Sequence, residues 1–314
     1  MVREHTGRNQ HGEEVSMKYS YFPGCSVRGT TKEYEESAKA VSKVLDIELD
    51  EISDWNCCGC NDAVYSYKPT YAIALAARNL ALAEKTRMEV TTLCTSCYFT
   101  LSSANKMLKD DSATKNKVDE ALKKADLTYN GGVRIRHFAE VLLSDVGFQK
   151  IKEKTKVSLK PLKVASYYGC LLVRPPNICN FDNPEHPTRL DELAESLGAS
   201  KVDYCARTRC CGAGLSFTDE DIMLRISKDI LLSAKNAGAD CIMTACTMCH
   251  FNLDAKQKQI ESHFKIKINL PVLHFTQLMG LAFGLTPKQL GLQRNCVSPT
   301  KITNLLVGEI SGKS

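Results

Sequence analysis

The chain has 314 residues, 43% hydrophobic and 25% charged, enough to bury a substantial core as one or two ordinary globular domains. Its formal net charge of +5 counts every cysteine as neutral, and no basic run with interleaved aromatic residues favours a nucleic-acid partner. The apolar stretch 270–285 is too short and too polar to cross a bilayer. Because no secretory signal is evident, fifteen cysteines indicate reduced thiols or metal ligands in a cytoplasmic protein, not disulfides.

The predicted elements begin after a polar stretch, 1–16, which we expect to be a loose extension and not a signal peptide or anchor. A β-prone run at 18–22 ends at Gly24-Cys25, and a helix is expected over 31–45. A second short strand leads to an adjacent cysteine pair. Further elements are a helix over 69–87, a strand over 88–93 that ends at a Cys-x-x-Cys motif, another helix, and a strand–helix segment at 134–142.

The same order returns in the second part of the chain. A strand over 163–168 ends at Gly169-Cys170, followed by helices over 188–197 and 218–237, a strand over 240–245, a second Cys-x-x-Cys motif and a strand–helix segment at 271–279. The Lys-rich stretch 149–163 is the best candidate for a linker. We therefore expect an N-terminal half over 17–155, a C-terminal half over 156–291 and a C-terminal tail over 292–314.

Alternating strands and helices predict an α/β fold with two Rossmann-like βαβ halves, related by internal duplication and a pseudo-twofold axis. In such a fold the cysteines lie at the carboxyl ends of the parallel strands, where open α/β sheets bind their ligands. Helix amino termini next to the cysteines would lower thiol pKa values and stabilise an anionic cluster.

Ten cysteines form one pattern twice: a lone Cys, an adjacent Cys-Cys pair, then Cys-x-x-Cys. The gaps are 31 and 35 residues in the first set, and 39 and 34 in the second. The first set is Cys25, Cys57, Cys58, Cys94 and Cys97, and the second set is Cys170, Cys210, Cys211, Cys246 and Cys249.

Five thiols are one more than a cubane iron–sulfur cluster or a tetrahedral zinc site needs. Adjacent cysteines rarely ligate one tetrahedral ion without strain, but they suit two irons of an extended cluster. The spacing therefore favours iron–sulfur clusters. Two structural zinc sites or thioredoxin-like dithiols remain the alternatives.

The complete pattern, found from about 19 to 299, resembles the duplicated cysteine-rich CCG domain of the family formed by the B-type subunits of heterodisulfide reductase. The resemblance includes the segment Leu290-Gly-Leu-x-Arg-x-x-Val-Ser-Pro299, and all ten cysteine positions are filled. It implies two noncubane 4Fe-4S clusters, one bound by each set, on either side of a disulfide substrate. The implied reaction is reduction of the coenzyme M–coenzyme B heterodisulfide to two thiols.

The resemblance also implies partners: a small iron–sulfur protein with cubane clusters, which is the C-type subunit, and a flavin protein, which is the A-type subunit. The chain itself has no nucleotide fingerprint and no ferredoxin motif, so electrons must enter from a partner. Two alternatives remain open. The chain could act on a different disulfide or sulfur substrate, or it could be an electron-transfer module without a substrate site of its own.

Other residues are weaker candidates. Arginines within four residues of the cysteines could bind anionic groups of a substrate, although for any single one a solvated surface charge is the favoured interpretation. They are Arg28, Arg174, Arg207 and Arg209. His250 is a weak candidate proton donor, whereas core or capping roles are expected for His137 and His274. Cysteines outside the pattern are expected to be structural, Cys60 being the best exception. They are Cys60, Cys179, Cys205, Cys241 and Cys296.

Overall fold

A computed structural model of the chain describes residues 17–60, 66–216 and 218–311, so the extension expected over 1–16 lies outside the described residues. The N-terminal half contains four strands: β1 (Met17–Phe22), β2 (Ile47–Glu51), β3 (Val90–Thr92) and β4 (Ile135–His137). Its helices are α1 (Cys25–Arg28), α2 (Lys32–Val44), α4 (Pro69–Glu84), α5 (Thr95–Asp110), α6 (Ser112–Lys123), α7 (Phe138–Val141), the π-turn η1 (Leu142–Val146) and α8 (Gly147–Lys154).

The C-terminal half repeats this order with β5 (Lys163–Tyr167), β6 (Ser200–Lys201), β7 (Cys241–Thr244) and β8 (Val272–His274). Its helices are α9 (Arg189–Ser196), η2 (Ala213–Leu215), α10 (Glu220–Asn236), α11 (Thr247–His250), η3 (Phe251–Ala255), α12 (Gln257–Phe264) and α13 (Phe275–Ala282). Two further helices follow, η4 (Leu292–Arg294) and α14 (Thr300–Ser311).

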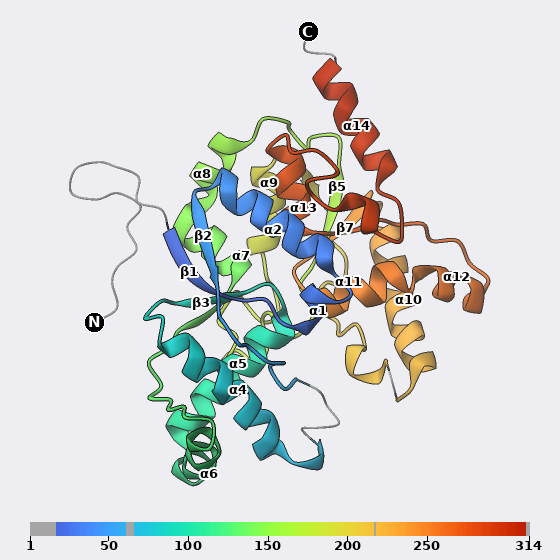
Figure 1. The fold of residues 1–314 in the computed structure, drawn as a ribbon. Helices are drawn as coiled ribbons and strands as arrows, with labels where there is room; N and C mark the ends of the chain where they lie inside the picture. The colour runs from blue at the N-terminus through green and yellow to red at the C-terminus, as the bar shows by residue number, and fades with distance from the viewer. Residues whose placement is uncertain (1–16, 61–65, 217, 312–314) are drawn as a thin grey trace, which may run out of the picture.

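Each half is built on a four-stranded parallel sheet. The strand orders are β2-β1-β3-β4 and β6-β5-β7-β8, and these are the same order when β5 is matched with β1. Helices surround both sheets (Figure 1). The predicted α/β fold with two duplicated βαβ halves is therefore confirmed.

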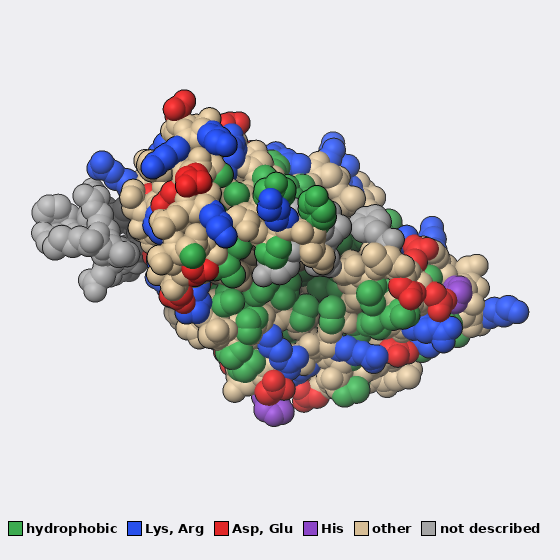
Figure 2. Space-filling model, turned by 90° about the horizontal axis from the view of Figure 1, so that it is seen from below, with side chains coloured by type: hydrophobic (Ala, Val, Ile, Leu, Met, Phe, Trp, Pro, Cys, Tyr) green, Lys and Arg blue, Asp and Glu red, His purple; other side chains and the backbone are tan. Residues whose placement is uncertain are grey.

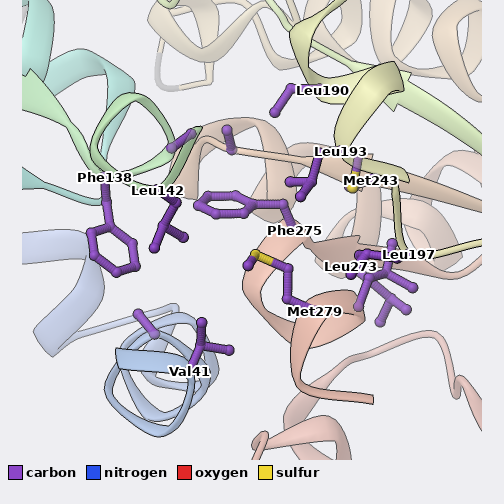
Figure 3. Packing of buried hydrophobic residues seen from close by; sticks show 14 of the residues in the cluster. Val41, Phe138, Leu142, Leu190, Leu193, Leu197, Met243, Leu273, Phe275 and Met279 are labelled. Carbon is purple, nitrogen blue, oxygen red and sulfur yellow. The ribbon is translucent and has the colours of Figure 1, made fainter. Parts of the chain in front are cut away.

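One hydrophobic core crosses between the halves. It joins Val41 of α2 and Phe138 of α7 to Phe275 and Met279 of α13, all of which are fully buried. The Phe138 and Phe275 rings lie 6.5 Å apart, and Figure 3 shows these side chains pointing toward one another. Because the core is shared, the two sheets are fixed relative to each other, and so are the cysteines at their strand ends.

The linker prediction was wrong in its first part, because 149–154 belongs to α8. The lysines of α8 line its solvent side, while Ile151 is fully buried in the shared core. Only 155–162 connects the halves without a helix or strand. The expected tail, 292–314, also packs on the fold: Leu292, Ile302 and Leu306 belong to the same core.

Within 17–60, 66–216 and 218–311, no helix has both the length and the apolar composition that crossing a membrane requires.

Candidate functional site

The lone cysteine of each set directly follows a glycine whose positive φ would strain any other residue. Gly24 has φ 77° and ψ 163°, a region essentially closed to other residues, and a Cβ placed there would lie 2.9 Å from Cys97 Sγ. Gly169 has φ 65°, and its Cβ would lie 3.1 Å from Cys249 Sγ. In both halves the turn after the first strand thus brings the backbone directly against the last cysteine of the set.

Each adjacent cysteine pair is held by polar side chains of helices that come later in the same half. In the first half, the Asn79 side chain accepts from Asn56 N–H at 2.9 Å and donates to Asn56 O at 3.0 Å. In the second half, Ser227 Oγ and Asn252 Nδ2 both donate to Cys211 O at 3.2 Å. These bonds fix the loops that carry the Cys-Cys pairs.

The Cys-x-x-Cys motifs open helices. Cys94 is the N-cap of α5 and Cys246 is the N-cap of α11, both with extended backbones. The following cysteine in each motif then lies inside the first helical turn, where free backbone N–H groups and the helix dipole favour a negative charge.

Within the first set, hydrogen bonds link all five thiols. Cys25 and Cys58 donate to Cys57, which lowers the pKa of Cys57. Hydrogen bonds from Cys58 and Cys94 lower the pKa of Cys97 despite its burial.

The second set is linked in the same way. Hydrogen bonds from Cys170 and Cys211 lower the pKa of Cys210, and Cys249 contacts both Cys211 and Cys246. The ten cysteines predicted from spacing are therefore brought together in two groups of five.

The two sets also touch each other. The Cys94 thiol hydrogen-bonds Cys246, and Thr247 Oγ1 donates to Cys94 Sγ at 3.1 Å. Thr95 makes the matching bond to Cys246. Hydrogen bonds from Cys249, then Cys94, with a weaker one from Thr95, hold the pKa of Cys246 well below its ordinary value.

Each set has a buried side and an exposed side. Cys94 and Cys246 are both 3% exposed, whereas Cys25, Cys57 and Cys210 are exposed to solvent. A reactant from solution would therefore meet Cys25 and Cys57 in the first set, and Cys210 beside the half-buried Cys170 in the second. Figure 2 shows one face of the molecule on which hydrophobic side chains gather around a hollow.

His137 positions the contact between the sets. Its Nδ1 accepts the N–H of Ala139, so Nε2 carries the proton and faces the carbonyls of Leu93 and Ala245, each at 3.0 Å. These two carbonyls directly precede Cys94 and Cys246 in sequence. Burial lowers the pKa of His137 to about 4, consistent with this neutral form, and the expected capping role is confirmed.

His250 lies in a buried cluster and not on the exposed side. Its Nδ1 is 3.6 Å from Glu33 Oε1, and Nε2 lies 3.0 Å from Val272 O. His274 Nε2 is also 3.6 Å from Glu33 Oε1 and has no hydrogen-bond partner among the described residues. The ligand atoms of Glu33, His250 and His274 lie close enough together to suggest a metal site. The two imidazole rings, however, are stacked 4.1 Å apart at 22°, so their nitrogen lone pairs are nearly parallel and do not converge on one ion.

Burial is the main cause that lowers the pKa values of His250 and His274 to about 3 and raises the pKa of Glu33. Both imidazoles are therefore uncharged at neutral pH. Sequence reasoning missed Glu33, which stands in the first turn of α2 without any motif around it.

All four candidate arginines form ion pairs within the chain. Arg207 is bound to Asp191, 3% exposed, at 3.0 Å, and so is part of the structure of the second half. Arg28 pairs with Glu35 and Glu51.

The other two arginines have weaker partners. Arg209 is 51% exposed and lies 3.6 Å from Asp229, and Arg174 pairs with the exposed Glu185. Arg209, next to Cys210, is therefore the arginine most available to an incoming anion.

The cysteines outside the pattern differ in their surroundings. Cys60 is exposed and hydrogen-bonds Cys58, so it lies beside the first set. Cys179 and Cys241 are fully buried among hydrophobic side chains. Cys205 and Cys296 are exposed, where Cys205 contacts Ser233.

Comparison with known proteins places the chain in a family. The model of the CCG cysteine-rich domain matches it twice, over 19–102 and 164–254, regions that hold the two thiol sets. The chain belongs to the CCG cysteine-rich domain family. Each matched region contains three strands of one sheet, β1–β3 in the first and β5–β7 in the second, so one CCG match falls in each half of the chain.

Relatives match the CCG chain over nearly its whole length. The B-type subunit of the ferredoxin:CoB-CoM heterodisulfide reductase of Methanosarcina mazei is 36% identical over 89% of this chain and 94% of its own length. A protein of Archaeoglobus profundus, named as similar to the B-type subunit of heterodisulfide reductase, is 34% identical over 90% and 95%. The membrane anchor protein of the 8-methylmenaquinol:fumarate reductase of Wolinella succinogenes is 34% identical over 92% and 100%.

The fold also occurs in a solved structure. A hypothetical protein from Helicobacter pylori matches with a TM-score of 0.71 at 14% identity, over 95% of this chain and 55% of that one. At this identity the likeness concerns the fold alone.

Proposed function

We propose that this chain is the disulfide-reducing component of a heterodisulfide reductase, holding two noncubane 4Fe-4S clusters. The first set would hold one cluster and the second set the other. The observation that carries the proposal is the pair of complete five-thiol groups in contact through Cys94 and Cys246. The glycine turns support it, because the absence of a Cβ at Gly24 and Gly169 leaves room for the sulfurs of Cys97 and Cys249 beside the strand ends.

Reduction of a disulfide to two thiols consumes two electrons and two protons. The clusters, when bound, supply the electrons one at a time. The chain provides matched ligand groups, one per half, whose exposed sides carry Cys25 and Cys57 or Cys210. Because His250 is buried against Glu33, we infer that protons come from solvent at the exposed side and not from this histidine.

The proposed substrate is the coenzyme M–coenzyme B heterodisulfide, whose anionic groups would be met by Arg209 and Arg174 beside the second set. The proposed partners are an iron–sulfur protein with cubane clusters and a flavin protein. The relatives named as the B-type subunits of heterodisulfide reductases support both proposals.

The test uses anaerobically purified chain with an artificial one-electron reductant. We expect about eight irons per chain, and two thiols released per heterodisulfide consumed. Cys58→Ser should lose activity, whereas Cys241→Ser, a buried cysteine outside both sets, should keep it. Stoichiometric zinc with little iron, or iron-loaded chain that leaves the heterodisulfide intact, would contradict the proposal.

A second candidate is an electron-transfer module whose substrate is reduced by a partner. The Wolinella relative favours it, since its name assigns it to a fumarate reductase and this chain spans its full length. The same assay separates the two: a pure relay would bind iron and accept electrons without releasing thiols from any disulfide.

A further inference from the structure

The motif residue after Cys94 and after Cys246 is threonine in both halves, and each hydroxyl reaches across to the other half. Thr247 Oγ1 lies 3.1 Å from Cys94 Sγ, and the Thr95 hydroxyl hydrogen-bonds Cys246. All four residues are at most 3% exposed. The bonds are thus reciprocal, and water does not compete with them.

The buried sulfurs of Cys94 and Cys246 are in contact, and hydroxyl donors such as those of Thr95 and Thr247 stabilise this arrangement. When both bind iron, Cys94 and Cys246 are thiolates, so two negative charges lie side by side where little water can solvate them. A hydroxyl that donates to a thiolate withdraws charge from it. At an iron–sulfur centre a hydrogen bond to a ligand sulfur favours the reduced, more negative state and raises the reduction potential.

We propose that Thr95 and Thr247 set the reduction potentials of the two clusters crosswise, each acting on the cluster of the opposite half. Thr247 raises the potential of the cluster on the first set, and Thr95 raises that of the cluster on the second set. Both are positioning residues that act through a sulfur. The inference rests on the proposed function, because it requires clusters on both sets.

The experiment measures midpoint potentials by redox titration followed by electron paramagnetic resonance. Each cluster is measured alone: Cys211→Ala leaves the first set intact, and Cys58→Ala leaves the second. In the Cys211→Ala chain, Thr247→Val should lower the midpoint potential, and Thr247→Ser should restore it. In the Cys58→Ala chain, Thr95→Val should do the same and Thr95→Ser should restore it.

The matched control is Thr91→Val, which removes a buried hydroxyl in β3 that has no hydrogen-bond partner among the described residues. It should leave both potentials unchanged while imposing the same change of side chain. Each valine variant is also made in the other cysteine-to-alanine chain, which keeps the cluster of its own half. Midpoint potentials of the valine variants that match this control, or a shift found only in the cluster of the variant's own half, would overturn the inference alone. Wild-type chain that binds no iron–sulfur cluster would overturn the proposed function and the inference together.

Discussion

Replacing Gly24 by alanine tests whether the turn after β1 is built for the cysteines. The backbone at φ 77° and ψ 163° costs a non-glycine residue about 1–3 kcal/mol. The new Cβ would also stand 2.9 Å from Cys97 Sγ, and since nonbonded contacts begin near about 3.5 Å, the sulfur must move by roughly 0.6 Å. Such a displacement exceeds the tolerance of about 0.5 Å within which a ligand set keeps its geometry.

The chain offers a matched control. Gly147 has φ 78° and ψ 158°, nearly the same backbone, but a Cβ there would meet nothing within 4 Å. Both alanine variants should lose about 1–3 kcal/mol of unfolding free energy in denaturant titrations of the cluster-free chain. Only Gly24→Ala should lose iron from the first set, measured by metal analysis and visible absorption. If the two variants bind equal iron, the close approach to Cys97 has no bearing on the site.

Four further outcomes are expected. Cys58→Ser and Cys211→Ser should each abolish nearly all disulfide reduction, and the double variant should be scarcely worse, since groups that act together are non-additive; substantial turnover in either single variant would contradict this. Air should bleach the visible absorption and remove activity together, because thiolate-bound clusters oxidise; full activity after long exposure would count against catalysis at clusters. Arg209→Ala should raise KM for an anionic disulfide several-fold while the iron content stays unchanged. Arg207→Gln, in contrast, should lower the unfolding free energy by about 3 kcal/mol, because it leaves the buried Asp191 without its partner. Burial raises the pKa of Asp254 to about 7, so the folded chain binds that proton more tightly than the unfolded one, and the contribution of Asp254 to stability falls as pH rises. The unfolding free energy of the wild type minus that of Asp254→Asn should therefore fall by about 4 kcal/mol between about pH 4 and 7; a difference that does not change with pH would contradict this.

Much of the fold follows from local signals. The strands that end at Gly24-Cys25 and Gly169-Cys170 are bounded by turn residues, and α4 begins at Pro69, the position at which a helix tolerates proline. The lysines of 149–154 suggested a linker because they occupy the solvent-facing side of α8. The side of α8 that faces the core is represented in this stretch by a single buried residue, Ile151.

The sequence predicted which cysteines lie together, but not which contacts join the two sets. Spacing identified ten cysteines, and the repeated Cys-Thr step was present in both motifs. Thr247 and Cys94 are 153 positions apart in the sequence, and their hydrogen bond depends on how the two sheets pack. No sequence pattern predicts such a contact. Glu33 was missed for the same reason, since only the packing of α2 against α13 brings it to His274.

The reciprocal bonds of Thr95 and Thr247 have the form of an isologous interface, in which residue i meets j and j meets i, as between two identical protomers. A half-length chain paired with itself would make these contacts, but it would present the same groups to both ends of a bound molecule. Joining the halves in one chain removes that restriction. His250 in one half can then stand where the other half has Tyr98, and the two sites can be chemically unequal, as the two ends of an unsymmetrical substrate are.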